Sequence, residues 1–157
     1  MVDIVLPEVR ARMMSAIKSK NTKPEMVIRC GLHALGFRYK LHDPSLPGKP
    51  DLVFPKYRAI ILVNGCFWHM HGCDLFKLPA TRTDFWLNKL ERNRSRDLQN
   101  IRTYMDSGWR VLIVWECALK GKDSVGTTTV LRQCAAWLIA GDQLENIERH
   151  DEDKAII

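Results

Sequence analysis

The chain has 157 residues, of which 46% are hydrophobic, and its formal net charge is +6. This length suits one domain with its own core, and no apolar run reaches the ~18 residues of a membrane-spanning helix, which argues against a membrane partner. The first ten residues lack the pattern of a signal peptide, which predicts a cytoplasmic location, and the positive charge favours an acidic partner such as nucleic acid.

Helix and strand signals alternate along the first half of the chain. Residues 7–18 are predicted to form a short N-terminal helix. A second helix begins after Thr22, which suits an N-cap, with Glu25 three residues on as in a capping box, and it ends before Gly36. The segments that follow are predicted to be a strand over 37–42, a loop over 43–50, and two strands over 51–54 and 58–63 that form a hairpin.

The second half contains the longest helical pattern, over residues 81–108, and the strongest strand, over 109–115. A final helix is predicted over 127–142, and the polar tail over 143–157 is expected to be loose. Helices around a small mixed β-sheet make the predicted fold class α/β, in one domain over residues 1–157.

The segment GCFWHMHGC, residues 65–73, places two cysteines and two histidines close together. The chain has five cysteines, and an odd count without a secretion signal favours metal binding over disulfides. Two Cys and two His from this segment would suffice for tetrahedral zinc. Cys117, after the strand 109–115, is a further donor, and a site that joins the loop to a core strand stabilises the fold more. The favoured ligands, which leave His69 free, are Cys66, His71, Cys73 and Cys117.

Aromatic residues accompany the ligands. Phe67 and Trp68 either cover the core beneath the metal or insert as a wedge between DNA base steps. Trp86 is a second candidate wedge, because it lies early in a strongly basic helix. That helix could equally present a solvated charged face. Its basic residues are Lys89, Arg92, Arg94, Arg96 and Arg102.

Asp51 follows a proline where a loop leads into a strand. Restriction-endonuclease-like nucleases place an aspartate there to hold Mg²⁺ against the scissile phosphate. They usually add an acid and a lysine on the partner strand, where this chain has Val63 and Gly65. His69 is therefore the candidate general base, because a neutral imidazole can take a proton from an attacking water.

Two carboxylates are candidate partners of this chemistry. Glu25 either orients a water on the metal or a nearby histidine, or serves only as a helix cap. Asp97 either hydrogen-bonds a histidine ring nitrogen and fixes its tautomer, or forms a surface pair with a helical base.

Five segments resemble the very short patch repair endonucleases, and the similarity covers about residues 8–120, in register and in order. These bacterial enzymes nick DNA beside T:G mismatches, which arise when 5-methylcytosine deaminates. A match of several long motifs in order is more specific than any single motif. The segments are LPGKPD, GCFWHMHGC, PATRTDFW, NRSRD and GWRVLIVWECAL.

The resemblance implies a restriction-endonuclease-like fold with a structural zinc. It implies that Asp51 and the backbone carbonyl of Val63 bind the catalytic Mg²⁺, that His69 is the general base, and that Phe67, Trp68 and Trp86 intercalate. DNA-binding residues within or near the matched motifs are Lys49, Arg82, Lys89, Arg92 and Arg96.

The implied substrate is double-stranded DNA with a T:G mismatch, cut 5′ to the thymine. The implied setting is the bacterial cytoplasm at the nucleoid, with functional links to a DNA cytosine-5 methyltransferase and a repair polymerase. Because a mismatch is asymmetric, one copy of the protein is enough to act on it, which predicts a monomer.

The chain departs from the best-known form of that family at two positions. Val63 replaces a threonine, and Asn64 replaces a histidine expected to contact the scissile phosphate or the leaving oxygen. Asn64 can donate a hydrogen bond but carries no charge, and this loss is expected to slow the chemistry by ~10²-fold. The alternatives are therefore a catalytically weakened mismatch- or DNA-binding homologue, a restriction-like nickase that reads a sequence, and, more distantly, a basic zinc protein that binds RNA.

Overall fold

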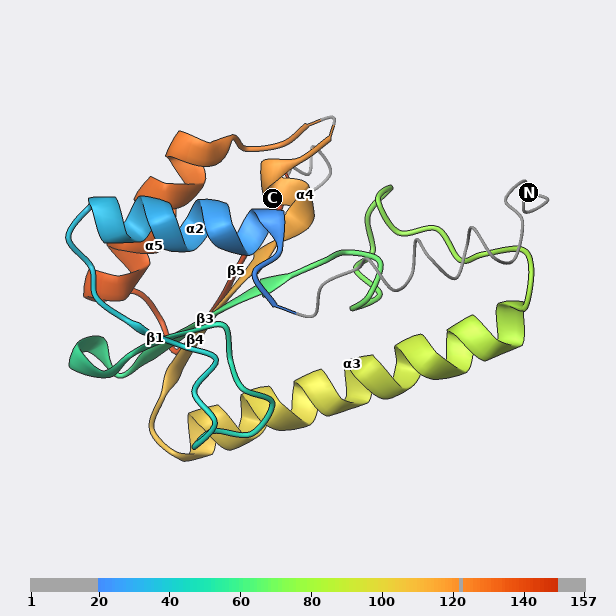
Figure 1. Ribbon diagram of the computed structural model, residues 1–157, viewed down its shortest axis with the longest axis horizontal. Helices are drawn as coiled ribbons and strands as arrows, with labels where there is room; N and C mark the ends of the chain where they lie inside the picture. Colours follow the sequence, from blue (N-terminus) through green and yellow to red (C-terminus); the bar gives the residue numbers. More distant parts are fainter. Residues whose placement is uncertain (1–19, 122, 150–157) are drawn as a thin grey trace.

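The computed structural model describes residues 20–121 and 123–149, so the helix expected over 7–18 lies outside the described residues. Figure 1 shows one sheet with α2 and α5 on one face and α3 on the other. Among the helices of the described ranges, none has the length and apolarity of a membrane span. The elements are α2 Lys23–Ala34, β1 Lys40–Leu41, β2 Leu52–Phe54, η1 Pro55–Tyr57, β3 Ala59–Asn64, α3 Thr83–Asp106, β4 Arg110–Trp115, α4 Glu116–Leu119, α5 Thr127–Ala140 and β5 Leu144–Ile147.

The five strands lie in chain order across the sheet. The first three form an antiparallel meander, which confirms the hairpin of β2 and β3. The pairs β3–β4 and β4–β5 are parallel, and each needs a helical crossover, supplied by α3 and α5. In this register Asn64 lies opposite Trp115. The loop after β3 and the turn after β4 therefore leave the same edge of the sheet.

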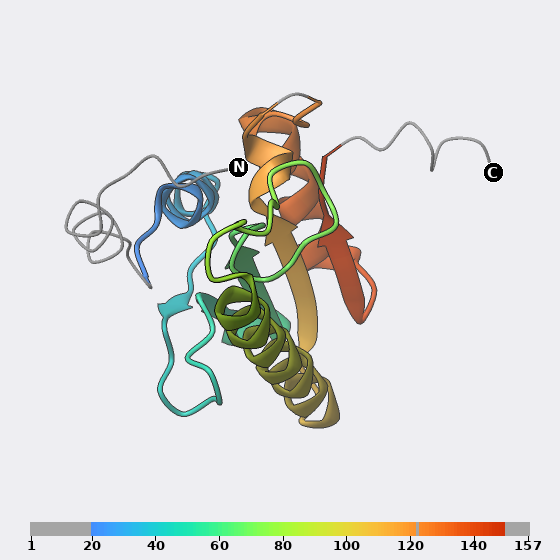
Figure 2. The same cartoon turned by 90° about the vertical axis from the view of Figure 1, so that its right-hand side faces the viewer.

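Helices cover both faces of the sheet, as Figures 1 and 2 show, and strands β2, β3 and β4 are mostly buried. One face packs Ile61 and Leu112 against Ile28 of α2 and Leu138 of α5. Helix α3 covers the opposite face with Ile101 and Tyr104, which pack with Val53, Ile60, Val111 and Ile113. This double coverage explains why β3 and β4 read as continuous apolar runs in the sequence.

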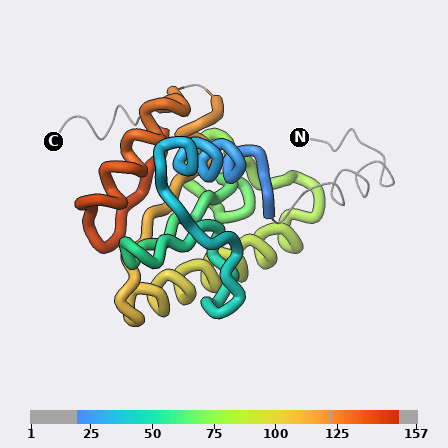
Figure 3. The backbone as a smooth tube through the Cα atoms, turned by 60° about the vertical axis from the view of Figure 1, so that its left-hand side comes forward, coloured from blue at the N-terminus to red at the C-terminus, as the bar shows by residue number. Residues whose placement is uncertain are grey.

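The loop between β1 and β2 is anchored to α3. The Tyr104 hydroxyl donates a hydrogen bond to the carbonyl of Pro47, and Figure 3 shows the loop extending to this helix. Gly48 adopts a φ of +74°, and a Cβ there would lie 2.4 Å from Asn100 Nδ2 of α3. The anchored loop ends at Asp51, so the contact helps to position that carboxylate.

The C-terminal tail is a correction to the sequence analysis. Residues 144–147 were expected to be loose, but they form β5, which pairs with β4 from Val111↔Leu144 to Val114↔Ile147. Ile147 is buried in the core, and Trp115 Nε1–H donates to Asn146 Oδ1 at 2.9 Å. Four residues with only two apolar side chains have little strand signal of their own, and the pairing with β4 supplies their strand conformation. The strand expected over 37–42 is also shorter, at Lys40–Leu41.

Candidate active site and metal centre

An open cleft runs along the edge of the sheet where β3 ends. Several predicted site residues line it together, although they come from separate parts of the chain: a loop before β2, the end of β3, the loop after β3, and helix α3. These residues are Asp51, Val63, Asn64, Phe67, Trp68, His69 and Asp97.

Asp51 lies at the start of β2 and is held from the neighbouring strand. The Val63 N–H donates to Asp51 Oδ2 at 2.8 Å. Burial raises the pKa of Asp51 to about 7, the nearby Glu25 adds to the rise, and the Val63 hydrogen bond opposes it. A buried carboxylate with a raised pKa is stabilised as an anion by a nearby cation, so this position favours metal binding.

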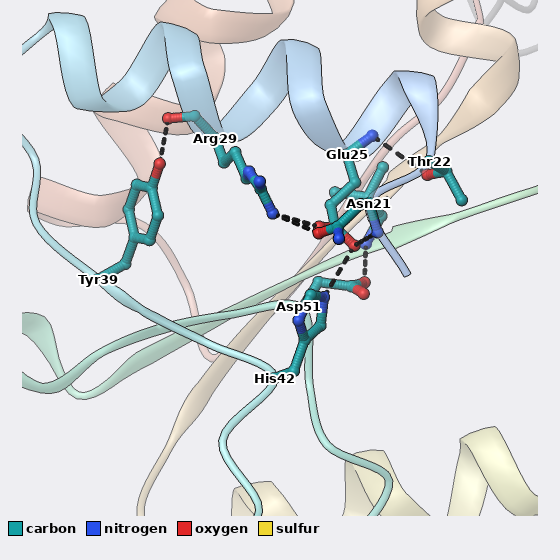
Figure 4. A network of polar contacts seen from close by, with 8 residues as sticks. Asn21, Thr22, Glu25, Arg29, Tyr39, His42 and Asp51 are labelled. Carbon is teal, nitrogen blue, oxygen red and sulfur yellow. Dashed lines mark hydrogen bonds and ion pairs between the residues drawn. The ribbon is translucent and has the colours of Figure 1, made fainter. Parts of the chain in front are cut away.

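Glu25 turns from the first turn of α2 toward Asp51, as Figure 4 shows. Thr22 caps this helix by accepting the Glu25 N–H at 3.4 Å, as predicted. The Glu25 carboxylate is 1% exposed, and it accepts from Asn21 N–H at 3.3 Å and Arg29 Nη1 at 3.1 Å. It is therefore a buried carboxylate beside Asp51, and its contact with Asn21 differs from a capping box, in which it would reach back to the N-cap residue.

His42 is a site residue that the sequence analysis missed. Its ring nitrogen Nε2 lies 3.1 Å from Glu25 Oε1, and its backbone N–H donates to the backbone carbonyl of Asp51 at 3.3 Å. Ligand atoms of Glu25, His42 and Asp51 lie within 4.8 Å of one another, so the three could hold a cation. The only sequence signal is indirect: the loop 43–50 joins two paired strands, which brings its two ends together.

His69 and Asp97 form a pair across the cleft wall. His69 Nδ1 contacts Asp97 Oδ2 of α3, so Asp97 is placed on a histidine ring nitrogen, the first of its two predicted roles. A carboxylate on Nδ1 favours a proton there and leaves Nε2 as the basic nitrogen. This arrangement suits proton transfer in the cleft.

A second cluster lies behind His69, where the loop after β3 meets the turn after β4. Ligand atoms of Cys66, His71, Cys73 and Cys117 lie within 4.8 Å of one another, and His69 is not among them. Cys66 and Cys117 are buried. Cys66 lowers the pKa of Cys117, and His71 adds to this effect, while Cys117 raises the pKa of Cys66. Three thiols and one imidazole are a donor set that fits zinc.

The aromatic rings pack against one another beside the cleft. Centroids of Phe67 and Trp68 are 5.0 Å apart, and Trp86 lies 5.6 Å from Phe67 and 6.0 Å from Trp68. All three side chains are half-buried, and none belongs to either core cluster. Lys89 Nζ lies 5.7 Å from both indole rings. The rings thus form a separate surface cluster, with a cation beside it.

The predicted DNA-binding residues divide into two groups. Lys49, Lys89 and Arg96 line the cleft. Arg82 instead stacks on Phe85, with 4.3 Å from its guanidinium carbon to the ring centroid. Arg92 is exposed on α3 but does not line the cleft. The structure therefore brings three of the five cations to the cleft.

Comparison with known proteins shows the family to which the chain belongs. The sequence profile of the family described as "DNA mismatch endonuclease Vsr" matches residues 2–75. The chain is 42% identical over 138 residues to "DNA mismatch endonuclease Vsr" of Escherichia coli K12, covering 88% of each protein. It is 47% identical over 119 residues to "Type II nicking enzyme V.XorIIP" of Xanthomonas oryzae pv. oryzae, covering 76% of this chain and 88% of that protein. The chain therefore belongs to the Vsr family of DNA mismatch endonucleases.

Proposed function

We propose that the chain nicks one strand of double-stranded DNA 5′ to the thymine of a T:G mismatch, by Mg²⁺-dependent hydrolysis of a phosphodiester bond. Its family makes it a DNA endonuclease, and the mismatch and the metal are our inference. The observation that carries the proposal is that Asp51 and the His69–Asp97 pair line one cleft with Phe67 and Trp68.

The metal-binding role falls to Asp51, with the backbone carbonyl of Val63 as the second protein ligand that the resemblance implies. Asp51 supplies a hard oxygen donor of the kind Mg²⁺ prefers, and the buried Glu25 adds a second negative charge beside it. Mg²⁺ bound there supplies Lewis-acid activation of the scissile phosphate and of water. Glu25 is held by Arg29 and His42, so its remaining role is to orient water at the cation.

His69 acts as the general base. Asp97 holds its Nδ1 side, so Nε2 accepts the proton of the attacking water, and the imidazolium that results is stabilised by the same carboxylate. Asn64 is buried at the end of β3 and lines the cleft, where it donates a neutral hydrogen bond to the phosphate.

Zinc at the four-residue cluster joins the loop after β3 to the turn after β4. His69, Phe67 and Trp68 lie in that loop, so the metal positions both the base and the wedge. Phe67, Trp68 and Trp86 exchange their contacts with one another for contacts with bases when they enter the stack. Unstacking DNA costs a few kcal/mol, and the cleft cations Lys49, Lys89 and Arg96 offset part of it through phosphate contacts.

The five-stranded mixed sheet, with Asp51 at the start of β2, supports a restriction-endonuclease-like fold. The same proposal places the protein in the bacterial cytoplasm at the nucleoid. It acts there as a monomer, beside a DNA cytosine-5 methyltransferase that creates the substrate and a polymerase that fills the patch.

The test uses two labelled duplexes that differ only in a T:G or T:A pair, incubated with purified protein and Mg²⁺. We expect a nick in the T:G duplex alone, 5′ to the thymine, and no nick from Asp51→Ala. Cleavage of both duplexes would instead support a sequence-reading nickase.

Asn64 motivates the second alternative, a homologue that binds mismatches but cuts slowly. Asn64→His restores a chargeable donor at the cleft, and we expect it to raise single-turnover nicking by up to ~10²-fold with little change in DNA binding. A variant no faster than the wild type would show that another group already supplies this charge.

A further inference from the structure

The end of the C-terminal strand reaches the metal cluster. Glu148 and Arg149 directly follow β5, and they lie outside the residues 2–75 that the family profile matches. Glu148 Oε2 lies 2.7 Å from His71 Nε2. The Arg149 N–H donates to Cys117 Sγ at 3.5 Å. Two residues of the cluster are therefore contacted by the segment directly after β5, which the sequence analysis assigned to a loose tail.

The two ring nitrogens of His71 have different partners. Nδ1 faces the thiols, at 3.6 Å from Cys117 Sγ, and Nε2 faces Glu148. A neutral imidazole that donates its lone pair to a metal carries its proton on the other nitrogen. A carboxylate at that nitrogen fixes the required tautomer and increases the donor strength of the ring. Glu148 is thus placed to direct Nδ1 toward a metal.

The orientation of the His71 ring is restrained from two directions. Trp115 stacks on it with 4.1 Å between centroids and 15° between planes. Stacking restrains the tilt of the ring but leaves rotation within its plane, and the hydrogen bond to Glu148 restrains that rotation. Together the two contacts restrain where Nδ1 points.

Arg149 connects the same strand to the ligand loop through its side chain as well as its backbone. Its guanidinium pairs with Asp74, which follows the ligand Cys73, and with Asp123 at 3.1 Å. Its N–H stabilises negative charge on Cys117 Sγ, because hydrogen bonds to ionised acceptors are stronger than neutral ones. The pair with Asp74 holds the loop and the strand together.

We propose that Glu148 and Arg149 are positioning residues of the zinc centre: the carboxylate orients His71 as a ligand, and the backbone amide supports the Cys117 thiolate. This inference rests on the zinc assignment in the proposed function. Because coupling is reciprocal, bound zinc also stabilises the docking of β5 on β4.

The test measures zinc affinity, which does not depend on catalysis. Full-length protein loaded with one zinc is titrated with a chromophoric chelator at fixed pH. We expect Glu148→Ala to weaken zinc binding by about 10–100-fold and Glu148→Gln by less, since an amide oxygen still accepts the hydrogen bond but lacks the charge. Glu145→Ala is the matched control, because Glu145 lies on β5 and bonds Asp142 N–H at 3.1 Å, away from the cluster. Wild-type affinity in Glu148→Ala would overturn the proposal.

A second pair of variants guards against misfolding of the point mutant. A chain ending at residue 152 keeps both positioning residues, and a chain ending at residue 147 lacks both but retains β5. We expect only the shorter chain to lose zinc affinity, and equal affinities would overturn the proposal. If the wild type binds no zinc at all, the zinc assignment itself is wrong. If the wild type binds zinc and Glu148→Ala binds it with equal affinity, only the positioning role of Glu148 is wrong.

Hydrogen exchange tests the reciprocal effect. Removing zinc from the wild type should speed amide exchange in Leu144–Ile147. The change should be smaller in Glu148→Ala, because this variant lacks the contact between Glu148 and His71. Unchanged exchange of β5 on zinc removal would contradict the coupling.

Discussion

Replacing Asp97 by asparagine is the sharpest test of the proposed base. The change keeps the size of the side chain but removes the negative charge that faces His69 Nδ1. We expect slower hydrolysis with unchanged mismatch affinity, because the charge matters only once His69 has taken a proton in the transition state. Asp97 would then be a positioning residue that acts through His69.

The magnitude follows from the contact and its exposure. Two unit charges at a hydrogen-bond distance of about 3 Å attract by ~1.4 kcal/mol in water and ~5.5 kcal/mol at an effective dielectric constant of ~20. The His69 and Asp97 side chains are 26% and 23% exposed, so the pair is partly screened and an intermediate value applies. About 3 kcal/mol corresponds to a rate ~10²-fold slower.

The assay is single-turnover nicking of the T:G duplex at saturating Mg²⁺, with binding measured separately in the absence of metal. Asp106→Asn is the matched control, because it makes the same change at the exposed end of the same helix. An Asp97→Asn rate within threefold of the wild type would refute the role given to the pair. A loss of binding as large as the loss of rate would point to a structural role instead.

Three further predictions concern the metals and the wedge. Because the pKa of Asp51 is raised to about 7 in the folded chain, the stability that this group contributes is greatest at low pH and is lost as the pH rises through about 7. Asp51→Asn should remove this loss of stability at high pH. Without metal, its melting temperature should therefore exceed that of the wild type at pH 8 and not at pH 4. Equal melting temperatures at pH 8 would contradict the raised pKa of Asp51. Chelation of zinc should lower the melting temperature of the domain, followed by far-UV circular dichroism, as well as stop nicking, and an unchanged melting temperature with lost activity would argue for a different role of the cluster. Trp68→Ala should weaken mismatch binding by about 1–3 kcal/mol with an unchanged spectrum, and an equal loss of fold would favour a core-covering role.

The elements of the fold were largely predictable from local patterns. Helix α2 begins at the predicted N-cap Thr22, and the apolar runs of β3 and β4 are strands as expected. These features depend on neighbours in the sequence, such as a capping side chain or a run of residues buried on both faces. The density of Cys and His in residues 65–73 likewise pointed to metal without any tertiary information.

The juxtapositions that carry the proposed chemistry depend on the tertiary structure. The parallel register of β3 and β4 brings Cys117 to the loop after Asn64, and α3 carries Asp97 to His69. His42 had no local signal, because its proximity to Glu25 comes from strand pairing across a loop. The contact from Glu148, directly after β5, to His71 joins residues 77 positions apart. Such contacts form only when the sheet assembles, since a four-residue segment gains its strand conformation and its partners from β4 rather than from its own sequence.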